Sequence, residues 1–169
     1  MSKGRVWKYG DDVNTDVIFP GRYTYKIMPP EEMARHALED LDPEFAAKVK
    51  PGDVVVAGKN FGCGSSREQA AACLKAAGIQ AVVAVSFARI YFRNAINLGL
   101  AVLQCPEAVQ TVAAGDEIDL VLASGEIRSA KGTFKFLPLP ESVLGILEAD
   151  GLLEYTKAKL GGPPPPARS

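Results

Sequence analysis

The residues best suited to chemistry lie in one short stretch, Gly62-Cys63-Gly64-Ser65-Ser66-Arg67-Glu68. Two hydroxyls, two glycines and an arginine stand together there, between an apolar run at 54–57 and a segment of helical composition at 65–77. Unpaired N–H groups at the start of a helix favour an anion, and arginine adds a positive fork that fits a carboxylate or phosphate. The stretch therefore predicts an anion-binding loop at the junction of a strand and a helix.

Helix capping is a simpler interpretation of the same stretch. Ser65 with Glu68, and Ser66 with Gln69, both have the spacing of a capping box. A cap explains one serine, but it does not explain a second serine, two glycines and an arginine where a helix prefers an acidic residue. The stretch also lacks the Gly-Lys-Ser/Thr of a nucleotide-binding P-loop, which favours a small carboxylate or phosphate over a nucleotide.

Two other kinds of catalytic site are disfavoured by what the chain contains. His36 is the single histidine, and its polar surroundings predict a solvated surface helix, so a free-standing hydrolase built on Ser65 lacks a nearby base. Cys63, Cys73 and Cys105 form neither a disulfide framework nor a zinc pattern. We therefore expect a chain that binds no metal of its own, in the reducing environment of the cytoplasm.

Length and composition indicate one globular domain. Of 169 residues, 47% are apolar and 23% charged, and we expect a domain over 1–160 followed by a flexible Pro-rich tail over 161–169. The 19 Lys and Arg residues nearly balance the 20 Asp and Glu, which argues against a nucleic acid or an anionic membrane as partner. The charged start of the chain does not resemble a signal peptide, and no apolar run reaches the length of a membrane span.

The stretch at 62–68 is called the serine loop below. The elements that must position it alternate between strand and helix. Buried strands are predicted at 54–57, 81–85 and 100–103, and helices at 65–77 and 87–98, which is the order of parallel strands with helical crossovers. The other expected elements are a strand at 6–9, a shaped surface loop at 10–28, helices at 29–38 and 43–49, antiparallel strands at 117–122, 126–128 and 133–137, and helices at 141–149 and 152–160. The predicted class is α/β, with a β-hairpin region packed on the parallel layer.

Several spaced motifs together resemble a known family. They are Asn14-Thr15-Asp16-Val17-Ile18 with Pro20-Gly21-Arg22-Tyr23, then 58–68 around the serine loop, then 86–90 and 93–97. In this order, and over roughly residues 5–160, the chain resembles the small subunits of isopropylmalate isomerase and homoaconitase, and also the swivelling C-terminal domain of aconitase. The resemblance implies a β/β/α fold with mixed sheet layers and helices.

The resemblance also implies half of an enzyme, a hydro-lyase that is active only with a large subunit. The large subunit would carry a 4Fe-4S cluster as Lewis acid, this chain would bind no cofactor, and the two would form a heterodimer or heterotetramer. By the motif match, Ser65 would be the catalytic base, supported by Arg67. Ser66 and Arg67 would hold a substrate carboxylate, and Asp16 would orient an arginine of the large subunit.

The same resemblance places the variable group of a small hydroxy di- or tricarboxylic acid against Tyr23-Thr24-Tyr25-Lys26. Homoaconitase-type relatives have an arginine two residues after the tyrosine and isopropylmalate-type relatives an aliphatic residue, whereas this chain has Tyr25. An aromatic ring suits a branched alkyl group better than a carboxylate, which favours interconversion of 2- and 3-isopropylmalate through isopropylmaleate, a step of leucine biosynthesis.

Three alternatives stay open at this stage. Lys26 could meet an anion, which leaves a homoaconitate-type or dimethylmalate-type substrate open. A non-catalytic regulatory subunit that binds a small anion is a further alternative from a different class.

The segment 22–30 has few apolar anchors, so we expect it to be mobile in the absence of the large subunit.

Overall fold

A mixed sheet of seven strands forms the centre of the computed structural model, which describes residues 3–163. Four neighbouring strands run parallel, and the remaining three continue the sheet in antiparallel pairing, in the order β4-β3-β2-β1-β5-β6-β7. The strands are β1 (Lys3–Lys8), β2 (Val54–Ala57), β3 (Ala81–Ala84), β4 (Ala101–Gln104), β5 (Glu117–Val121), β6 (Glu126–Ser129) and β7 (Gly132–Lys135).

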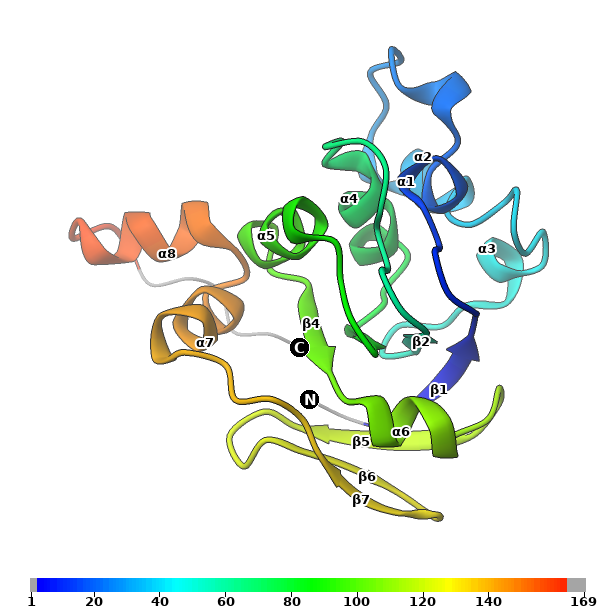
Figure 1. Cartoon of the computed structure of the whole chain (residues 1–169). Coiled ribbons are helices and arrows are strands. Elements are labelled where there is room, and N and C mark those ends of the chain that lie inside the picture. The colour runs from blue at the N-terminus through cyan, green and yellow to red at the C-terminus, as the bar shows by residue number, and fades with distance from the viewer. Residues whose placement is uncertain (1–2, 164–169) are drawn as a thin grey trace.

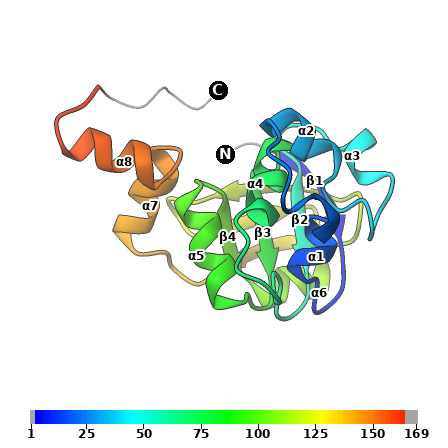
Figure 2. The ribbon, with the colours of Figure 1, turned by 90° about the horizontal axis from the view of Figure 1, so that it is seen from above.

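The parallel strands lie in the middle of three layers. Every residue of β2 and β3 is buried, as expected for short β-branched runs that are covered on both faces. Figure 2 shows helices above β2, β3 and β4 and the antiparallel strands beneath them, so the sheet curls under itself. This arrangement is the β/β/α fold predicted from the motifs. The hairpin region packs under the parallel layer and is also hydrogen-bonded to it through β1 and β5.

Short helices connect the strands (Figure 1). They are α1 (Thr15–Ile18), the 3-10 turn η1 (Gly21–Tyr23), α2 (Pro30–Arg35), α3 (Phe45–Lys48), α4 (Gln69–Ala76), α5 (Arg89–Asn97), α6 (Pro106–Thr111), α7 (Glu141–Glu148) and α8 (Leu152–Lys159). The predicted strands and the two C-terminal helices are confirmed to within a few residues. Helix α6 has no counterpart among the predicted elements.

The surface loop predicted at 10–28 is partly wrong, because it contains α1 and η1 and contributes to the core. Ile18 and Phe19 are buried. Asn14 caps α1 by accepting a hydrogen bond from the N–H of Val17 at 2.9 Å. A helix of one turn is too short to show a hydrophobic period, so this cap is the signal that the sequence offers.

Two predicted helices begin too early. Helix α4 starts at Gln69 rather than at residue 65, because Gly64 has a φ of +107° and the side chains of Ser65 and Arg67 bond to Thr15 and Thr24. Helix α5 starts at Arg89 rather than at residue 87, because Phe87 forms a bridge to Phe61 beside the parallel strands.

Helix α2 ends at Arg35, three residues before the predicted end, and Leu38 is buried with a φ of +57°. Most of the tail predicted at 161–169 falls outside the described residues. Between residues 3 and 163, no helix combines the length and apolar character needed to cross a membrane.

Candidate active-site loop

The serine loop is held between α1 and α5. The backbone N–H of Thr15 donates to the carbonyl of Cys63 at 2.8 Å, and that of Gly62 donates to Val13 at 2.8 Å. Gly62 has a φ of +80°, and a Cβ there would lie 2.1 Å from the ring of the buried Tyr91. The loop can approach α5 this closely only because residue 62 has no side chain.

Ser65 lies on the exposed side of this loop, in contact with Thr15 and Arg67. Its N–H donates to Thr15 Oγ1 at 3.0 Å, and the two hydroxyl oxygens are 3.1 Å apart. Arg67 Nε donates to Ser65 Oγ at 2.7 Å. The structure therefore brings together Ser65 and Arg67, as the sequence suggests, and adds Thr15, to which sequence reasoning gives no role.

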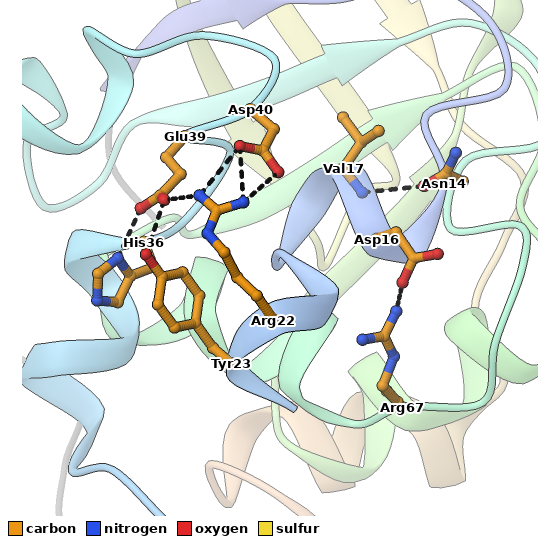
Figure 3. A network of polar contacts seen from close by, with 9 residues as sticks. All are labelled: Asn14, Asp16, Val17, Arg22, Tyr23, His36, Glu39, Asp40 and Arg67. Atoms are coloured by element: carbon orange, nitrogen blue, oxygen red, sulfur yellow. Dashed lines mark hydrogen bonds and ion pairs between the residues drawn. The ribbon is translucent and has the colours of Figure 1, made fainter. Parts of the chain in front are cut away.

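Arg67 is fixed by three partners and is only 17% exposed. Besides Ser65, its guanidinium donates to the hydroxyl of Thr24 and forms an ion pair with Asp16, as Figure 3 shows for the aspartate. The sequence led us to expect that Asp16 orients an arginine of another subunit. In this chain it pairs with Arg67, which directs its Nε–H toward Ser65 Oγ.

Ser66 is also exposed, and its carbonyl accepts a hydrogen bond from Asn94 on α5 at 2.9 Å. Within the described part of the chain, the N–H groups of Ser66, Arg67 and Glu68 donate to no protein acceptor. They are available to an anion at the positive end of α4. The capping-box alternative is wrong, since Glu68 occupies the N-cap of α4 and no side chain caps it.

The four residues expected to contact the substrate's variable group point in different directions. Thr24 reaches Arg67, and its carbonyl also accepts from Gln69 at 3.2 Å. Tyr23 turns away from the serine loop, and Lys26 Nζ lies 5.4 Å from the centre of its ring. Tyr25 is 97% exposed. Of this segment, the chain alone brings only Thr24 to the serine loop.

A second polar network, centred on Glu39, anchors the segment that carries Thr24 (Figure 3). Glu39 accepts from the hydroxyl of Tyr23 at 3.0 Å, pairs with Arg22, and lies 2.6 Å from His36 Nδ1. Arg22 also pairs with Asp40 at 3.0 Å. Partial burial raises the pKa of Glu39, but the hydrogen bonds from His36, Tyr23 and Arg22 outweigh it and lower this pKa below its usual value.

The expectation that His36 is solvated on a surface helix is wrong. It follows the end of α2, is about three-quarters buried, and stacks on Tyr23 with the ring centres 4.0 Å apart. The network joins residues up to 18 positions apart, so no local pattern reveals it as a whole. The one available signal is the i, i+3 spacing of His36 and Glu39.

The cysteines lie apart from one another. Cys73 and Cys105 are buried, burial raises the pKa of both thiols, and Cys63 is half-buried beside the serine loop. Among residues 3–163, no three His, Cys, Asp or Glu side chains gather in a way that could hold a metal ion. The polar groups gathered at the serine loop are hydroxyls, a guanidinium and backbone N–H groups.

Comparison with known proteins identifies the family. The family model of the aconitase C-terminal domain matches residues 23–108. The 3-isopropylmalate dehydratase small subunit of Caldicellulosiruptor bescii is 52% identical over 160 residues, covering 94% of this chain and 96% of the relative. The small subunit 1 of Archaeoglobus fulgidus is 54% identical over 157 residues, covering 92% and 96%. The chain belongs to the family of 3-isopropylmalate dehydratase small subunits.

Two further comparisons support this family of dehydratase small subunits. The isopropylmalate/citramalate isomerase small subunit of Methanocaldococcus jannaschii is 51% identical over 94% of this chain and 95% of the relative. A crystal structure of 3-isopropylmalate dehydratase from the same organism aligns with a TM-score of 0.88 at 45% identity, covering 94% of both chains. The family, the fold and the enzyme class predicted from the motifs are confirmed.

Proposed function

We propose that the chain is the small subunit of an enzyme that interconverts 2- and 3-isopropylmalate through isopropylmaleate, a step of leucine biosynthesis. The observation that carries the proposal is Arg67 Nε donating to the exposed Ser65 Oγ at 2.7 Å. This pair stands in a chain about half identical, over more than nine-tenths of its length, to proteins named for the dehydration of 3-isopropylmalate.

In this proposal Ser65 is the base that removes a proton from the carbon next to a substrate carboxylate. A serine hydroxyl is a poor base at its ordinary pKa, so its anionic form needs donors close by. Arg67 is such a donor, and the free N–H groups of 66–68 can bind the substrate carboxylate together with Arg67. Ser66 would contribute through its N–H or its side chain.

The name small subunit implies a large partner, and we infer that this partner carries a 4Fe-4S cluster. The cluster would supply Lewis-acid chemistry at the substrate hydroxyl and carboxylate. This chain would close over it as one half of a heterodimer or heterotetramer, with Asp16 orienting an arginine of the large subunit. The free thiols of Cys63, Cys73 and Cys105 support a reducing, cytoplasmic location.

The choice of substrate would depend on Tyr23-Thr24-Tyr25-Lys26. Tyr25 extends away from this chain, so it would meet a branched alkyl group only when the large subunit closes the other side of the site. Lys26 is also exposed and would meet the extra carboxylate of a homoaconitate-type substrate, whereas a dimethylmalate-type substrate would suit Tyr25. Citramalate belongs in the comparison because one relative is named for it.

The deciding experiment is anaerobic reconstitution with the cluster-bearing large subunit of the same organism. Isopropylmalate, dimethylmalate, homocitrate and citramalate are assayed side by side, with Ser65→Ala and, as matched control, Ser124→Ala in the exposed β5–β6 turn. We expect isopropylmalate to be preferred, and Ser65→Ala to lower kcat by about 10²–10⁴-fold, the usual contribution of a general base. Ser124→Ala should retain full activity.

Size-exclusion chromatography of the same samples shows whether the two subunits remain together. Preference for homocitrate would move the substrate assignment to Lys26. An intact complex without turnover of any substrate would instead favour a regulatory subunit that binds a small anion. Turnover that survives Ser65→Ala would remove the serine from the mechanism.

A further inference from the structure

Thr15 lies directly beneath the serine loop and is only 2% exposed. Its backbone N–H donates to the carbonyl of Cys63 at 2.8 Å, which fixes the first residue of α1 against the loop. Its hydroxyl oxygen lies 3.0 Å from the N–H of Ser65 and 3.1 Å from Ser65 Oγ. A buried hydroxyl thus contacts both the backbone and the side chain of one exposed serine.

The neighbouring groups determine which hydrogen bonds the Thr15 hydroxyl accepts and which it donates. A threonine hydroxyl has one proton to donate and two lone pairs to accept with, whereas a backbone N–H can only donate. Thr15 Oγ1 must therefore accept from Ser65 N–H. In the described part of the chain, Ser65 Oγ is the only acceptor within reach of the remaining proton, and a buried hydroxyl proton needs an acceptor.

Arg67 Nε is the second donor to the same oxygen, at 2.7 Å, and a guanidinium can never accept. Ser65 Oγ then receives two hydrogen bonds from the protein. Its own proton is left to point away from both donors, on the exposed side of the loop. When this proton leaves, the oxygen keeps both donors without any rearrangement of the loop.

We propose that Thr15 is a catalytic residue that stabilises the anionic form of Ser65 together with Arg67. In the step concerned, Ser65 Oγ⁻ takes a proton from the substrate carbon: the C–H bond breaks, the O–H bond forms, and the electron pair stays on the substrate. Donors placed before the reaction stabilise such an oxyanion far better than water, which must reorganise. This inference rests on the proposed role of Ser65.

The surrounding residues are arranged so that Thr15 can reach the serine. A Cβ on Gly64 would lie 3.0 Å from Thr15 Oγ1, and the φ of +107° at this position also disfavours any side chain. On the other side, the side chain of Asn14 caps α1 and so fixes the turn that begins with Thr15. The contact depends on both neighbours.

The test uses the holoenzyme reconstituted with its large subunit and compares Thr15→Val with Thr15→Ser. Valine keeps the shape and removes the hydroxyl, whereas serine keeps the hydroxyl. We expect Thr15→Val to lower kcat by about 100-fold, the loss typical of one oxyanion donor, with little change in KM. The midpoint of the ascending limb of the pH–rate profile, where Ser65 loses its proton, should move to higher pH. Thr15→Ser should retain most of the activity and the original midpoint.

A merely structural role would have a different signature. If Thr15→Val only displaced the loop, kcat would fall equally at every pH and the midpoint would not move. That result, or unchanged kcat and midpoint, would overturn the proposal. Should Thr15→Val fail to assemble, Gly64→Ala replaces it, because its Cβ would press on Thr15 Oγ1 and should shift the midpoint in the same direction.

Ser65→Ala in the same series separates the two claims. If Ser65→Ala retains turnover, the proposed function of the serine fails and Thr15 has no anion to stabilise. If Ser65→Ala abolishes turnover while Thr15→Val behaves like the wild type, only the role of Thr15 fails.

Discussion

Gly62 is the residue that allows the serine loop to approach α5. Its φ of +80° disfavours any side chain, and a Cβ would overlap the ring of the buried Tyr91. Gly62→Ala should lower the free energy of unfolding by about 2–4 kcal/mol, since both backbone strain and overpacking contribute. Urea denaturation followed by circular dichroism measures this change.

Gly125→Ala is the matched control, because Gly125 has a φ of +70° and a Cβ added there would have no atom within 4 Å. It should cost only about 1 kcal/mol, the conformational part of the effect. Equal losses in the two variants would mean that the ring of Tyr91 contributes nothing.

The three cysteines should differ in reactivity. Burial raises the pKa of Cys73 and of Cys105, so few thiolates form there and reagents have little access, whereas Cys63 is half-buried. In the native chain we expect one thiol to react quickly with a disulfide reagent, and all three to react after unfolding. Cys63→Ser should remove the fast phase, and a fast phase that persists would contradict the assignment.

Sequence reasoning identifies Ser65 and Arg67 because their types and spacing within one loop are informative. It gives Thr15 no role because the two hydroxyls are 50 positions apart, and only the folded chain brings them together. It does not predict the ion pair of Asp16 with Arg67, and the role of Asp16 toward an arginine of the large subunit stays a prediction. Long-range pairs between irregular segments have no periodicity from which they could be predicted.

At the scale of elements, the side chain of Glu39 anchors the segment 20–28. It joins Arg22, Tyr23 and His36, and the next residue of the segment, Thr24, contacts Arg67. Glu39→Gln should release this anchor. We expect amide exchange over 21–28 to become about tenfold faster, in line with the ~1.4 kcal/mol of a charge-assisted hydrogen bond, and KM to rise more than kcat falls.

Glu44→Gln is the control for this experiment, because Glu44 is exposed and its ion pair is with Lys48, one turn further along the chain. Hydrogen exchange read by mass spectrometry follows both variants. Slow exchange over 21–28 in Glu39→Gln would show that Thr24 alone anchors the segment. Exchange that is fast in the wild-type chain would instead support the mobility expected for residues 22–30 without the large subunit.

The lowered pKa of Glu39 also predicts a pH dependence. A carboxyl whose pKa is lower in the folded chain stabilises the fold above its unfolded pKa, and this stabilisation is lost as the pH falls through the folded value. Protection of 21–28 should therefore be steady down to about pH 5 and decrease below pH 4.5, the usual pKa of glutamate. In Glu39→Gln the decrease below pH 4.5 should be absent, and an unchanged decrease would show that Glu39 is not its cause.

The elements that the sequence predicts well are those whose residues share one environment. Strands β2 and β3 are apolar throughout because both faces are covered. Helices α7 and α8 are long enough for a helical composition to be recognised in the sequence. The missed elements, α1, η1 and α6, have only three to six residues, and α1 depends on a cap and on tertiary contacts. The late start of α4 has the same cause, since Ser65 bonds to Thr15 in place of the helix.

At the scale of the whole molecule, β1 unites the two halves of the sheet. It pairs in parallel with β2 and antiparallel with β5, so the layer that carries the serine loop and the layer beneath it share one strand. The buried carboxylate of Asp53 secures this strand by accepting from Trp7 Nε1 at 2.9 Å and from the N–H of Arg5 at 3.3 Å. The loop that follows β2 contains Ser65. Because β1 pairs with β2, a shift of β1 would also shift Ser65.

The surface that meets the large subunit should lie around the segment 20–28. Tyr25 and Ile27 are fully exposed there, beside the residues that contact Arg67, although apolar side chains gain free energy when buried. Ile27→Glu should therefore weaken assembly by at least about tenfold, since burying an unpaired charge costs well over ~1.4 kcal/mol. Analytical ultracentrifugation of the mixed subunits measures the dissociation constant.

Leu153→Glu provides the comparison, because Leu153 is another exposed apolar residue, on α8 at the opposite end of the molecule in Figures 1 and 2. It should leave assembly unchanged if the large subunit covers only the side of the serine loop. Should Leu153→Glu weaken assembly and Ile27→Glu leave it intact, the interface would lie on α8. Ser65 would then lie away from the partner, and the proposed site shared by the two subunits would be ruled out.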